Sequence, residues 1–336
     1  MPPLSKITVM IPPHRAAGIF TLAFLLFVSE GTPLAFGYRT LGMQANVDGR
    51  ATHGYRYAAD KGVSEDDPAV LRGLRRVAAQ GDPQAQYDLG LKYAYGWGVP
   101  KDDAAAVRWF RRAAEQGEPR AQHALGIMYA FGRGVLRDDA AAVRWFRRAA
   151  EQGEPRAQRS LGSMYSAGRG VPKDLAASAL WMRRAAEQGD MIAQNHLGTK
   201  YKLGRGVTRN LAESVRWYRR AAEQGYAGAE TSLGFMYSKG EGVARDDAES
   251  VRWFHRAAER GYLSAQSVLG LVYAKGRGVP VDKVKSYAWY SIAARQGNES
   301  AKKGTKTVAG WMTRSQLARA RKLADSYWTR YVLPFR

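Results

Sequence analysis

The 336-residue chain contains no cysteine, which excludes disulfide bonds, thiolate nucleophiles and thiolate metal ligands. Its five histidines, at positions 14, 53, 123, 196 and 255, do not have the spacing of a metal site. No serine lies in a Gly-x-Ser-x-Gly motif, and no Gly-x-Gly pair continues into the Gly-Lys-Ser/Thr of a phosphate-binding loop. We therefore predict no catalytic residue, no metal site and no cofactor, and we do not expect an enzyme.

Long apolar runs are also scarce. One run, Ala16 to Val28, follows basic residues and is broken before Pro33. Ala35-Phe36-Gly37 places small residues at the positions that precede a cleavage site. This pattern is typical of a secretory signal peptide over residues 1–37, with Met10 as an alternative start. The run is shorter than the roughly 20 residues that span a bilayer, although an uncleaved anchor is the alternative. The prediction is a bacterial periplasmic, secreted or cell-envelope protein.

Acidic residues are outnumbered by basic ones. The chain has 52 Lys and Arg against 30 Asp and Glu, a net charge of +22 and a pI near 10.2. A charge of this size favours anionic partners and opposes self-association.

The most prominent feature that the sequence does contain is a repeated ten-residue stretch, Arg-Trp-Phe-Arg-Arg-Ala-Ala-Glu-Gln-Gly. It begins at Arg108 and returns, with changes, every 36 residues. The copies begin at residues 108, 144, 180, 216, 252 and 288. Strict repetition at this period predicts an array in which each unit packs against its neighbours.

The repeat period divides the chain. Residues 82–297 form six full repeats, which we number 1 to 6, and residues 38–48 are predicted to be a linker. Residues 49–81 align in register with the repeats but lack their core residues, as terminal repeats often do. Residues 298–336 contain a truncated repeat and a C-terminal capping helix, for which Thr313 and Gln316 predict a capping box.

Each repeat is predicted to contain two helices, which makes the chain all-α. In the first repeat, helix A covers about 83–95, and Gly90 in its middle indicates close approach of a neighbouring helix. Helix B covers about 102–117, with Trp109 and Phe110 on its core-facing side.

Two recurrent residue types receive structural interpretations. The tryptophans at positions 109, 145, 181, 217, 253 and 289 share one repeat position, and we interpret them as core residues rather than as stacking platforms for bases or sugars. Acidic residues recur where helix B begins and are interpreted as N-caps. Asn210 with Glu213, and Asp246 with Glu249, predict capping boxes.

The spacing of these residues carries a resemblance to a known family. In the second repeat the pattern is formed by Ala121, Leu125, Gly126, Tyr129, Gly132, Gly134, Val135, Asp138, Ala142, Trp145, Ala149, Ala150 and Gly153. It resembles the Sel1-like repeat family, a relative of the tetratricopeptide repeats. The resemblance implies a right-handed α/α superhelical solenoid that acts as a scaffold or adaptor for other proteins. One branch of the family, secreted and rich in cysteine, binds or hydrolyses β-lactams. This chain departs from that branch, so a β-lactam-binding or hydrolysing enzyme is the weakest of three hypotheses.

The arginines of helix B suggest an anionic-surface hypothesis. Stacked helices would align them into ridges on the outer side, where they would bind anionic polysaccharide, peptidoglycan or lipid. The alternative is a solvated face. Nucleic acid is disfavoured, because the chain has an export signal and no aromatic residues interleave with these arginines. The ridge residues are Arg108, Arg111, Arg112, Arg144, Arg147, Arg148, Arg216, Arg219 and Arg220.

Helix A suggests a protein-binding hypothesis, which we prefer. By resemblance to tetratricopeptide arrays it lines the concave side of the solenoid, and three of its positions vary freely between repeats. We expect these positions to face neither neighbouring repeat and to form a groove for a protein or peptide; the alternative is unconstrained surface. The groove residues are Tyr87, Leu91, Tyr95, His123, Ile127, Phe131, Arg159, Ser163, Asn195, Thr199, Leu203, Thr231, Phe235, Ser267 and Leu271.

Overall fold

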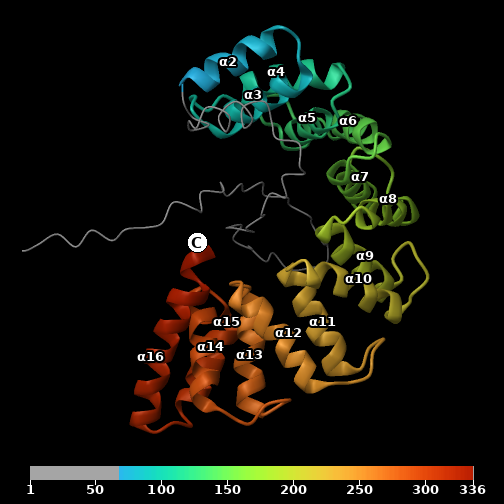
Figure 1. Ribbon diagram of the computed structural model, residues 1–336. Helices are drawn as coiled ribbons and strands as arrows, with labels where there is room; N and C mark the ends of the chain where they lie inside the picture. Colours follow the sequence, from blue (N-terminus) through green and yellow to red (C-terminus); the bar gives the residue numbers. More distant parts are fainter. Residues whose placement is uncertain (1–67, 336) are drawn as a thin grey trace, which may run out of the picture.

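The computed structural model describes residues 68–335, and these form fifteen α-helices without a β-strand. The helices follow one another as antiparallel pairs along a C-shaped arc, with α2 at one end and α16 at the other (Figure 1). The predicted signal peptide and linker, and the first half of the degenerate repeat, lie outside these residues. No helix between residues 68 and 335 is long and apolar enough to cross a bilayer.

The first helix of each repeat, the A helix, lies on the inner side of the arc, as α3, α5, α7 and α9 show most clearly in Figure 1. The six A helices are α3 (Pro83–Tyr95), α5 (Pro119–Phe131), α7 (Pro155–Ala167), α9 (Met191–Leu203), α11 (Ala227–Lys239) and α13 (Leu263–Lys275). The six B helices, which lie outside, are α4 (Asp103–Glu115), α6 (Asp139–Glu151), α8 (Leu175–Glu187), α10 (Leu211–Glu223), α12 (Asp247–Glu259) and α14 (Lys283–Arg295).

The ends of the helices are set by a few side chains. The Asp102 carboxylate accepts a hydrogen bond from the Ala105 backbone N–H at 2.8 Å and so caps α4. Gly96 ends α3 with φ of 78°, a left-handed conformation that glycine adopts without strain. Asn210 and Asp246 cap α10 and α12 in the same way as Asp102.

The two capping boxes predicted at α10 and α12 are only half formed. Glu213 and Glu249, which would complete them, instead form ion pairs with Arg216 and Arg252 three residues later. The prediction was wrong because an arginine on the same helix face competes for the carboxylate.

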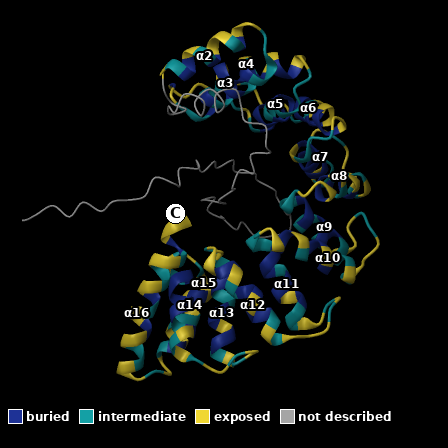
Figure 2. Cartoon of the chain, in the orientation of Figure 1, coloured by how far each residue is buried: buried dark blue, intermediate teal, exposed yellow. Residues whose placement is uncertain are grey.

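The interior glycine of each A helix is required for packing, as the sequence predicts. A Cβ atom on Gly126 of α5 would lie 2.6 Å from the ring of Phe146, which packs against α5 from the B helix α6 of the same repeat. The predicted tryptophan ladder also belongs to the core: Trp217, Trp253 and Trp289 are buried, and the other three pack against core clusters. Buried residues therefore lie mainly on the sides of the helices that face neighbouring helices (Figure 2).

A ladder of glutamine side chains, of which the A-helix members are buried, joins consecutive repeats. The Gln122 side-chain N–H donates to the Ala114 carbonyl of the preceding repeat at 3.1 Å, and Gln152 donates to the Gln122 side-chain oxygen at 2.8 Å. Four other repeats form the same ladder, through Gln86 with Gln116, Gln158 with Gln188, Gln194 with Gln224 and Gln266 with Gln296.

Repeat 5 replaces this amide ladder with charges. Glu230 occupies the buried glutamine position and binds Arg256 at 3.2 Å and Arg260 at 3.5 Å. Arg256 also donates to the Ala222 carbonyl at 3.2 Å, the bond that a glutamine side chain makes elsewhere. The change at residue 230 is therefore matched by the change at residue 260.

Both ends of the array are closed by helices. At the N-terminal end, α2 (Pro68–Ala79) makes the contacts of a B helix, since Arg75 donates to the Tyr93 hydroxyl and Ala78 accepts from Gln86. At the C-terminal end, α15 (Glu299–Ala309) precedes α16 (Arg314–Tyr331), which begins with the predicted capping box. α16 covers Trp289, which stacks against Tyr327 and Tyr331.

Candidate functional site

The predicted groove residues lie on the A helices, but the structure divides them by burial. His123, Ile127, Arg159, Ser163 and Thr231 are buried. Leu203, Phe235 and Leu271 are exposed, with 50%, 37% and 42% of their surface accessible. The remaining seven are partly buried: Tyr87, Leu91, Tyr95, Phe131, Asn195, Thr199 and Ser267.

The N-terminal part of the inner side is aromatic. Tyr87 packs against Phe110, and the Arg120 guanidinium of the next repeat lies 5.2 Å from the centre of the Tyr87 ring. Tyr95 stacks on Trp97 with 4.5 Å between ring centres. Burial raises the pKa of Tyr87 to about 12, so its hydroxyl stays protonated near neutral pH.

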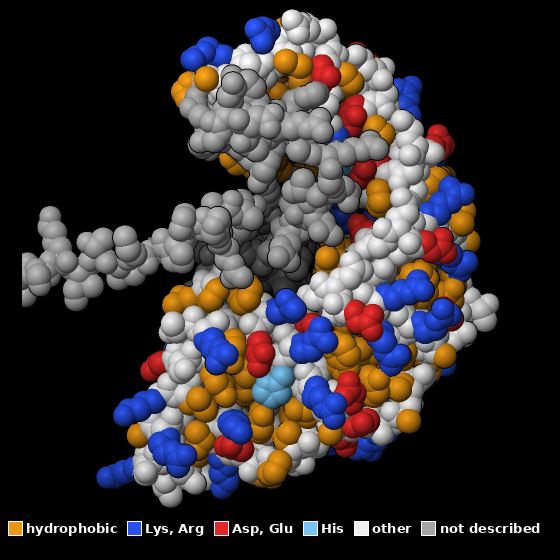
Figure 3. Space-filling view, in the orientation of Figure 1, with side chains coloured by type: hydrophobic (Ala, Val, Ile, Leu, Met, Phe, Trp, Pro, Cys, Tyr) orange, Lys and Arg blue, Asp and Glu red, His pale blue; other side chains and the backbone are white. Residues whose placement is uncertain are grey.

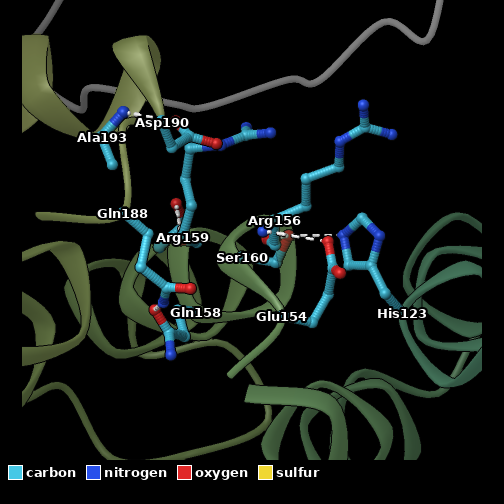
Figure 4. Close-up of polar contacts among 10 residues, drawn as sticks. His123, Glu154, Arg156, Gln158, Arg159, Ser160, Gln188, Asp190 and Ala193 are labelled. Carbon is cyan, nitrogen blue, oxygen red and sulfur yellow. Dashed lines mark hydrogen bonds and ion pairs between the residues drawn. The ribbon is translucent and has the colours of Figure 1, made fainter. Parts of the chain in front are cut away.

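The middle of the inner side is polar, and its side chains point from one repeat toward the next (Figure 4). His123 Nε2 lies 3.0 Å from the Ser160 hydroxyl, and Arg159 Nε lies 3.0 Å from the Asp190 carboxylate. Asp190 also caps α9 through the Ala193 N–H. The expectation that these positions face neither neighbouring repeat was therefore wrong for His123 and Arg159.

Both histidines in this region are held in the neutral form. Burial, reinforced by the positive charges of Arg159 and Arg156, lowers the pKa of His123 to about 3. Burial and Arg159 lower the pKa of His196 to about 4. Within residues 68–335 no group of three or more His, Cys, Asp or Glu side chains is arranged to hold a metal ion.

The C-terminal part of the inner side is more apolar. Phe235 packs edge-on against Phe254 at 5.0 Å and keeps over a third of its surface exposed. The acidic caps of the A helices are also lost here: Tyr226 and Tyr262 stand where Asp190 caps α9, and neither makes a side-chain cap hydrogen bond. The inner side of the arc is thus aromatic near the N-terminal end, polar and charged in the middle, and apolar near the C-terminal end.

The arginines of the predicted outer ridges form three rows with different surroundings. Arg111, Arg147 and Arg219 donate to the tyrosine hydroxyl of the next repeat, at 2.9, 3.0 and 2.8 Å. Arg112, Arg148 and Arg220 stack over Trp109, Trp145 and Trp217. The third row, Arg108, Arg144 and Arg216, is exposed. On the face shown in Figure 3, basic side chains are interleaved with acidic and hydrophobic ones rather than gathered in one patch.

Helix pairs stacked at a constant period, joined by repeated contacts and closed at both ends, define an α-solenoid. The Sel1 repeat model matches six segments, residues 83–118, 119–154, 155–190, 192–226, 227–262 and 263–298, and the chain belongs to the Sel1 repeat family. Proteins of this family are typically non-enzymatic scaffolds for protein–protein interaction.

One solved structure supports this assignment, and two others show a weaker likeness. A Sel1 repeat protein from Oxalobacter formigenes is 34% identical, covers 74% of this chain and 100% of its own, and superposes with a TM-score of 0.67. A protective antigen of uropathogenic Escherichia coli with an SLR fold is 28% identical and covers 83% of both chains, with a TM-score of 0.45. An immunity protein from Pseudomonas aeruginosa is 21% identical over 65% of this chain and 83% of its own, with a TM-score of 0.41. No curated protein matches the chain.

Sequence reasoning missed several residues that the structure places beside the groove positions, namely Arg156, Asp190, His196, Lys200 and Arg205. A signal for two of them was available in the aligned repeats. Lys200 stands where three other repeats have Met128, Met164 and Met236, a position that only repeat 1 also fills with lysine. Leu175 lies opposite Arg205 where three other repeats have aspartate.

Proposed function

We propose that this Sel1-repeat chain is an exported, non-enzymatic scaffold that holds a protein partner along the inner side of its arc. The observation that carries the proposal is the row of exposed apolar side chains on three successive A helices, Leu203, Phe235 and Leu271. Exposed apolar side chains on adjacent elements of a solenoid supply the contacts that bind an extended partner. The apolar run in residues 1–37 supports export to the bacterial envelope.

The test is capture of partners from bacterial envelope extracts by the chain from Tyr38 onward. Replacing Leu203, Phe235 and Leu271 together by serine should reduce capture at least tenfold, because each apolar side chain contributes about 1 kcal/mol or more when buried by a partner. Leu180→Ser is a matched control, since Leu180 is also 50% exposed but lies on the B helix α8. Unchanged capture by the triple variant, with an unchanged helical circular dichroism spectrum, would rule out this row as the binding surface.

A second candidate function uses the exposed outer row Arg108, Arg144 and Arg216. The exposed fraction of the Arg144 side chain is 68% and that of Arg216 is 63%. An anionic polysaccharide, peptidoglycan or lipid could therefore reach both, in competition with their own ion pairs to Asp138 and Glu213. Replacing all three by glutamine should weaken binding to isolated envelope material if this function operates. The same variant should leave capture of a protein partner unchanged if the inner side is the site.

Enzymatic activity of the β-lactam-binding branch is the third alternative. We expect no turnover of a chromogenic β-lactam at high protein concentration, and measurable turnover would contradict the scaffold proposal.

A further inference from the structure

An arginine–aspartate pair joins the connectors of successive repeats. Arg133, in the turn after α5, donates to the Asp103 carboxylate at 2.6 Å and to the Ala94 carbonyl at 3.2 Å. Arg169, in the turn after α7, makes the same two contacts with Asp139 and Ala130. In each case the carboxylate belongs to the first residue of the preceding B helix.

The junction between repeats 3 and 4 keeps the arginine but lacks the carboxylate. Arg205 corresponds to Arg133 and Arg169, while Leu175 takes the place of the aspartate. The backbone arrangement is preserved, because Gly206 packs against the Leu175 backbone as Gly134 packs against Asp103. Arg205 is exposed, and within residues 68–335 its side chain has no hydrogen bond or ion pair.

The following junction, between repeats 4 and 5, shows how the array balances the loss of the aspartate. Leu211 again replaces the aspartate, but there the arginine is replaced by Glu241. Glu241 binds Lys202 at 3.0 Å, and this contact lowers the pKa of its carboxyl group. Among the junctions that the structure describes, only the one between repeats 3 and 4 therefore has a connector arginine, Arg205, opposite an apolar residue, Leu175.

A second cation lies at the same junction. Lys200, on α9, occupies the core position of Met128, Met164 and Met236, and only 7% of its surface is exposed. No hydrogen bond or ion pair to its ammonium group occurs in the described part of the chain. Burial and the nearby Arg205 lower the pKa of Lys200 to about 8. An ammonium group that is mostly removed from water and has no counter-ion is unfavourable and would be stabilised by an anion.

The surrounding charges do not neutralise these two cations. Arg159 on α7 is paired with Asp190, and His196, one turn before Lys200 on α9, is neutral near pH 7 because its pKa is lowered to about 4. Leu203 is half exposed and lies between Lys200 and Arg205 in the chain. The junction thus combines two uncompensated positive charges with an exposed apolar side chain.

We propose that the junction of repeats 3 and 4 binds the carboxylate of an aspartate or glutamate side chain of the protein partner, held by Arg205 and Lys200 in place of the missing aspartate. This inference rests on the proposed function and specifies the partner chemistry: an acidic residue next to an apolar one, which contacts Leu203. The carboxylate is favoured as the anion because the array itself pairs one with the connector arginine at two other junctions.

The probes are two labelled hexapeptides of alternating sequence, Glu-Leu and Gln-Leu, and binding is measured by fluorescence anisotropy at pH 7 and low salt. The full chain should bind the Glu-Leu peptide about tenfold more tightly than the Gln-Leu peptide. Leu175→Asp should abolish this preference, because it supplies the carboxylate from within the chain. Lys200→Met, which restores the residue of three other repeats, should reduce it, whereas Leu175→Asn should preserve it.

Proton linkage provides an independent readout. The preference for the Glu-Leu peptide should fall between pH 7 and pH 9 as Lys200 loses its proton, and this fall should be absent in Lys200→Met. The charged and titratable groups that face Lys200 are Arg205 and His196, and the pKa of His196 is lowered to about 4, well below the range of this experiment.

Equal binding of both peptides by the wild-type chain would overturn the inference, as would an unchanged preference in Leu175→Asp. Competition by inorganic phosphate without any binding of the Glu-Leu peptide would also overturn it, because the site would then hold a phosphate rather than a partner carboxylate. None of these results would affect the capture experiment with the Leu203, Phe235 and Leu271 variant, so the inference and the proposed function fail separately.

Discussion

The B helices and A helices of the array differ in how strictly they repeat. The B helices of repeats 1 and 2, Asp103–Glu115 and Asp139–Glu151, have identical sequences. The A helices α3 and α5 keep their alanine, leucine, glycine and tyrosine positions but change at Tyr87/His123 and at other inner positions. The outer row of arginines that contacts the next tyrosine is maintained through repeat 4, and His255 takes over this contact in repeat 5.

This difference shows that the repeated residues form the inter-repeat contacts of the solenoid. Where Glu230 replaces a glutamine in such a contact, its partner changes as well, to Arg260. At the junction of repeats 3 and 4, Leu175 replaces the aspartate but Arg205 is kept, so its charge has no partner within the described residues. For this reason we assign the binding role to this junction rather than to the arginine ridges.

The largest effect should come from the tryptophan ladder of the B helices. Trp289 is buried and stacks on Tyr327 and Tyr331 of the capping helix. Trp289→Ala should lower the free energy of unfolding by about 3–5 kcal/mol, as measured by urea denaturation. Leu180→Ala, at an exposed B-helix position, should change it by less than about 1 kcal/mol and serves as the control. Similar losses in both variants would contradict the distinction between core and surface on these helices.

Acidification should destabilise the inner side. The pKa of His123 is about 3 in the folded protein, against 6.5 in an unfolded chain. Between these values the unfolded state binds more protons, so the free energy of unfolding falls as the pH drops below about 6.5. We expect a loss on the order of a few kcal/mol between pH 7 and pH 4 from this residue. His123→Tyr, the residue of repeat 1, should show a smaller loss over the same range; identical pH profiles would contradict the assignment.

The glycines of the helices should respond to alanine in opposite directions. Gly126→Ala should lower stability by about 1–3 kcal/mol, because its Cβ would meet the Phe146 ring. Gly73→Ala should raise stability by about 0.5–1 kcal/mol, because Gly73 lies inside α2 with no atom within 4 Å of an added Cβ. Thermal denaturation of both variants tests the pair, and stabilisation by both would show that Phe146 moves aside at little cost.

The smallest effect should come from the stacked arginines. Arg112 lies 4.9 Å from the centre of the Trp109 ring and is exposed. Arg112→Gln should lower the free energy of unfolding by about 0.5–1 kcal/mol, measured by urea denaturation with Lys101→Gln, in the exposed connector after α3, as a control. A loss well above this range would mean that the outer row supports the core directly.

Much of the fold could be predicted from the sequence because the same physical requirement appears six times. The glycine at position 126 and the aromatic ring at position 146 recur together, so their contact is visible in the repeat pattern. The inner side could not be predicted in the same way. His123 contacts Ser160 and Arg159 pairs with Asp190, and in each case the contact joins a residue found in one repeat to a residue of the next repeat, so the repeat pattern does not reveal it. The competition between Arg216 and the α10 N-terminus for Glu213 is likewise decided by side-chain geometry.

The near-identity of the first two junctions has a consequence for the length of the array. Arg111 reaches Tyr129 as Arg147 reaches Tyr165, and Arg133 reaches Asp103 as Arg169 reaches Asp139. Removing residues 119–154 would bring Tyr165 to Arg111 and Arg169 to Asp103 without creating a new kind of contact. Loss or duplication of one 36-residue unit in the coding sequence would therefore yield a shorter or longer arc with the same joints. The distance between the two ends of the arc would change, while Lys200, Leu203 and Arg205 stayed intact.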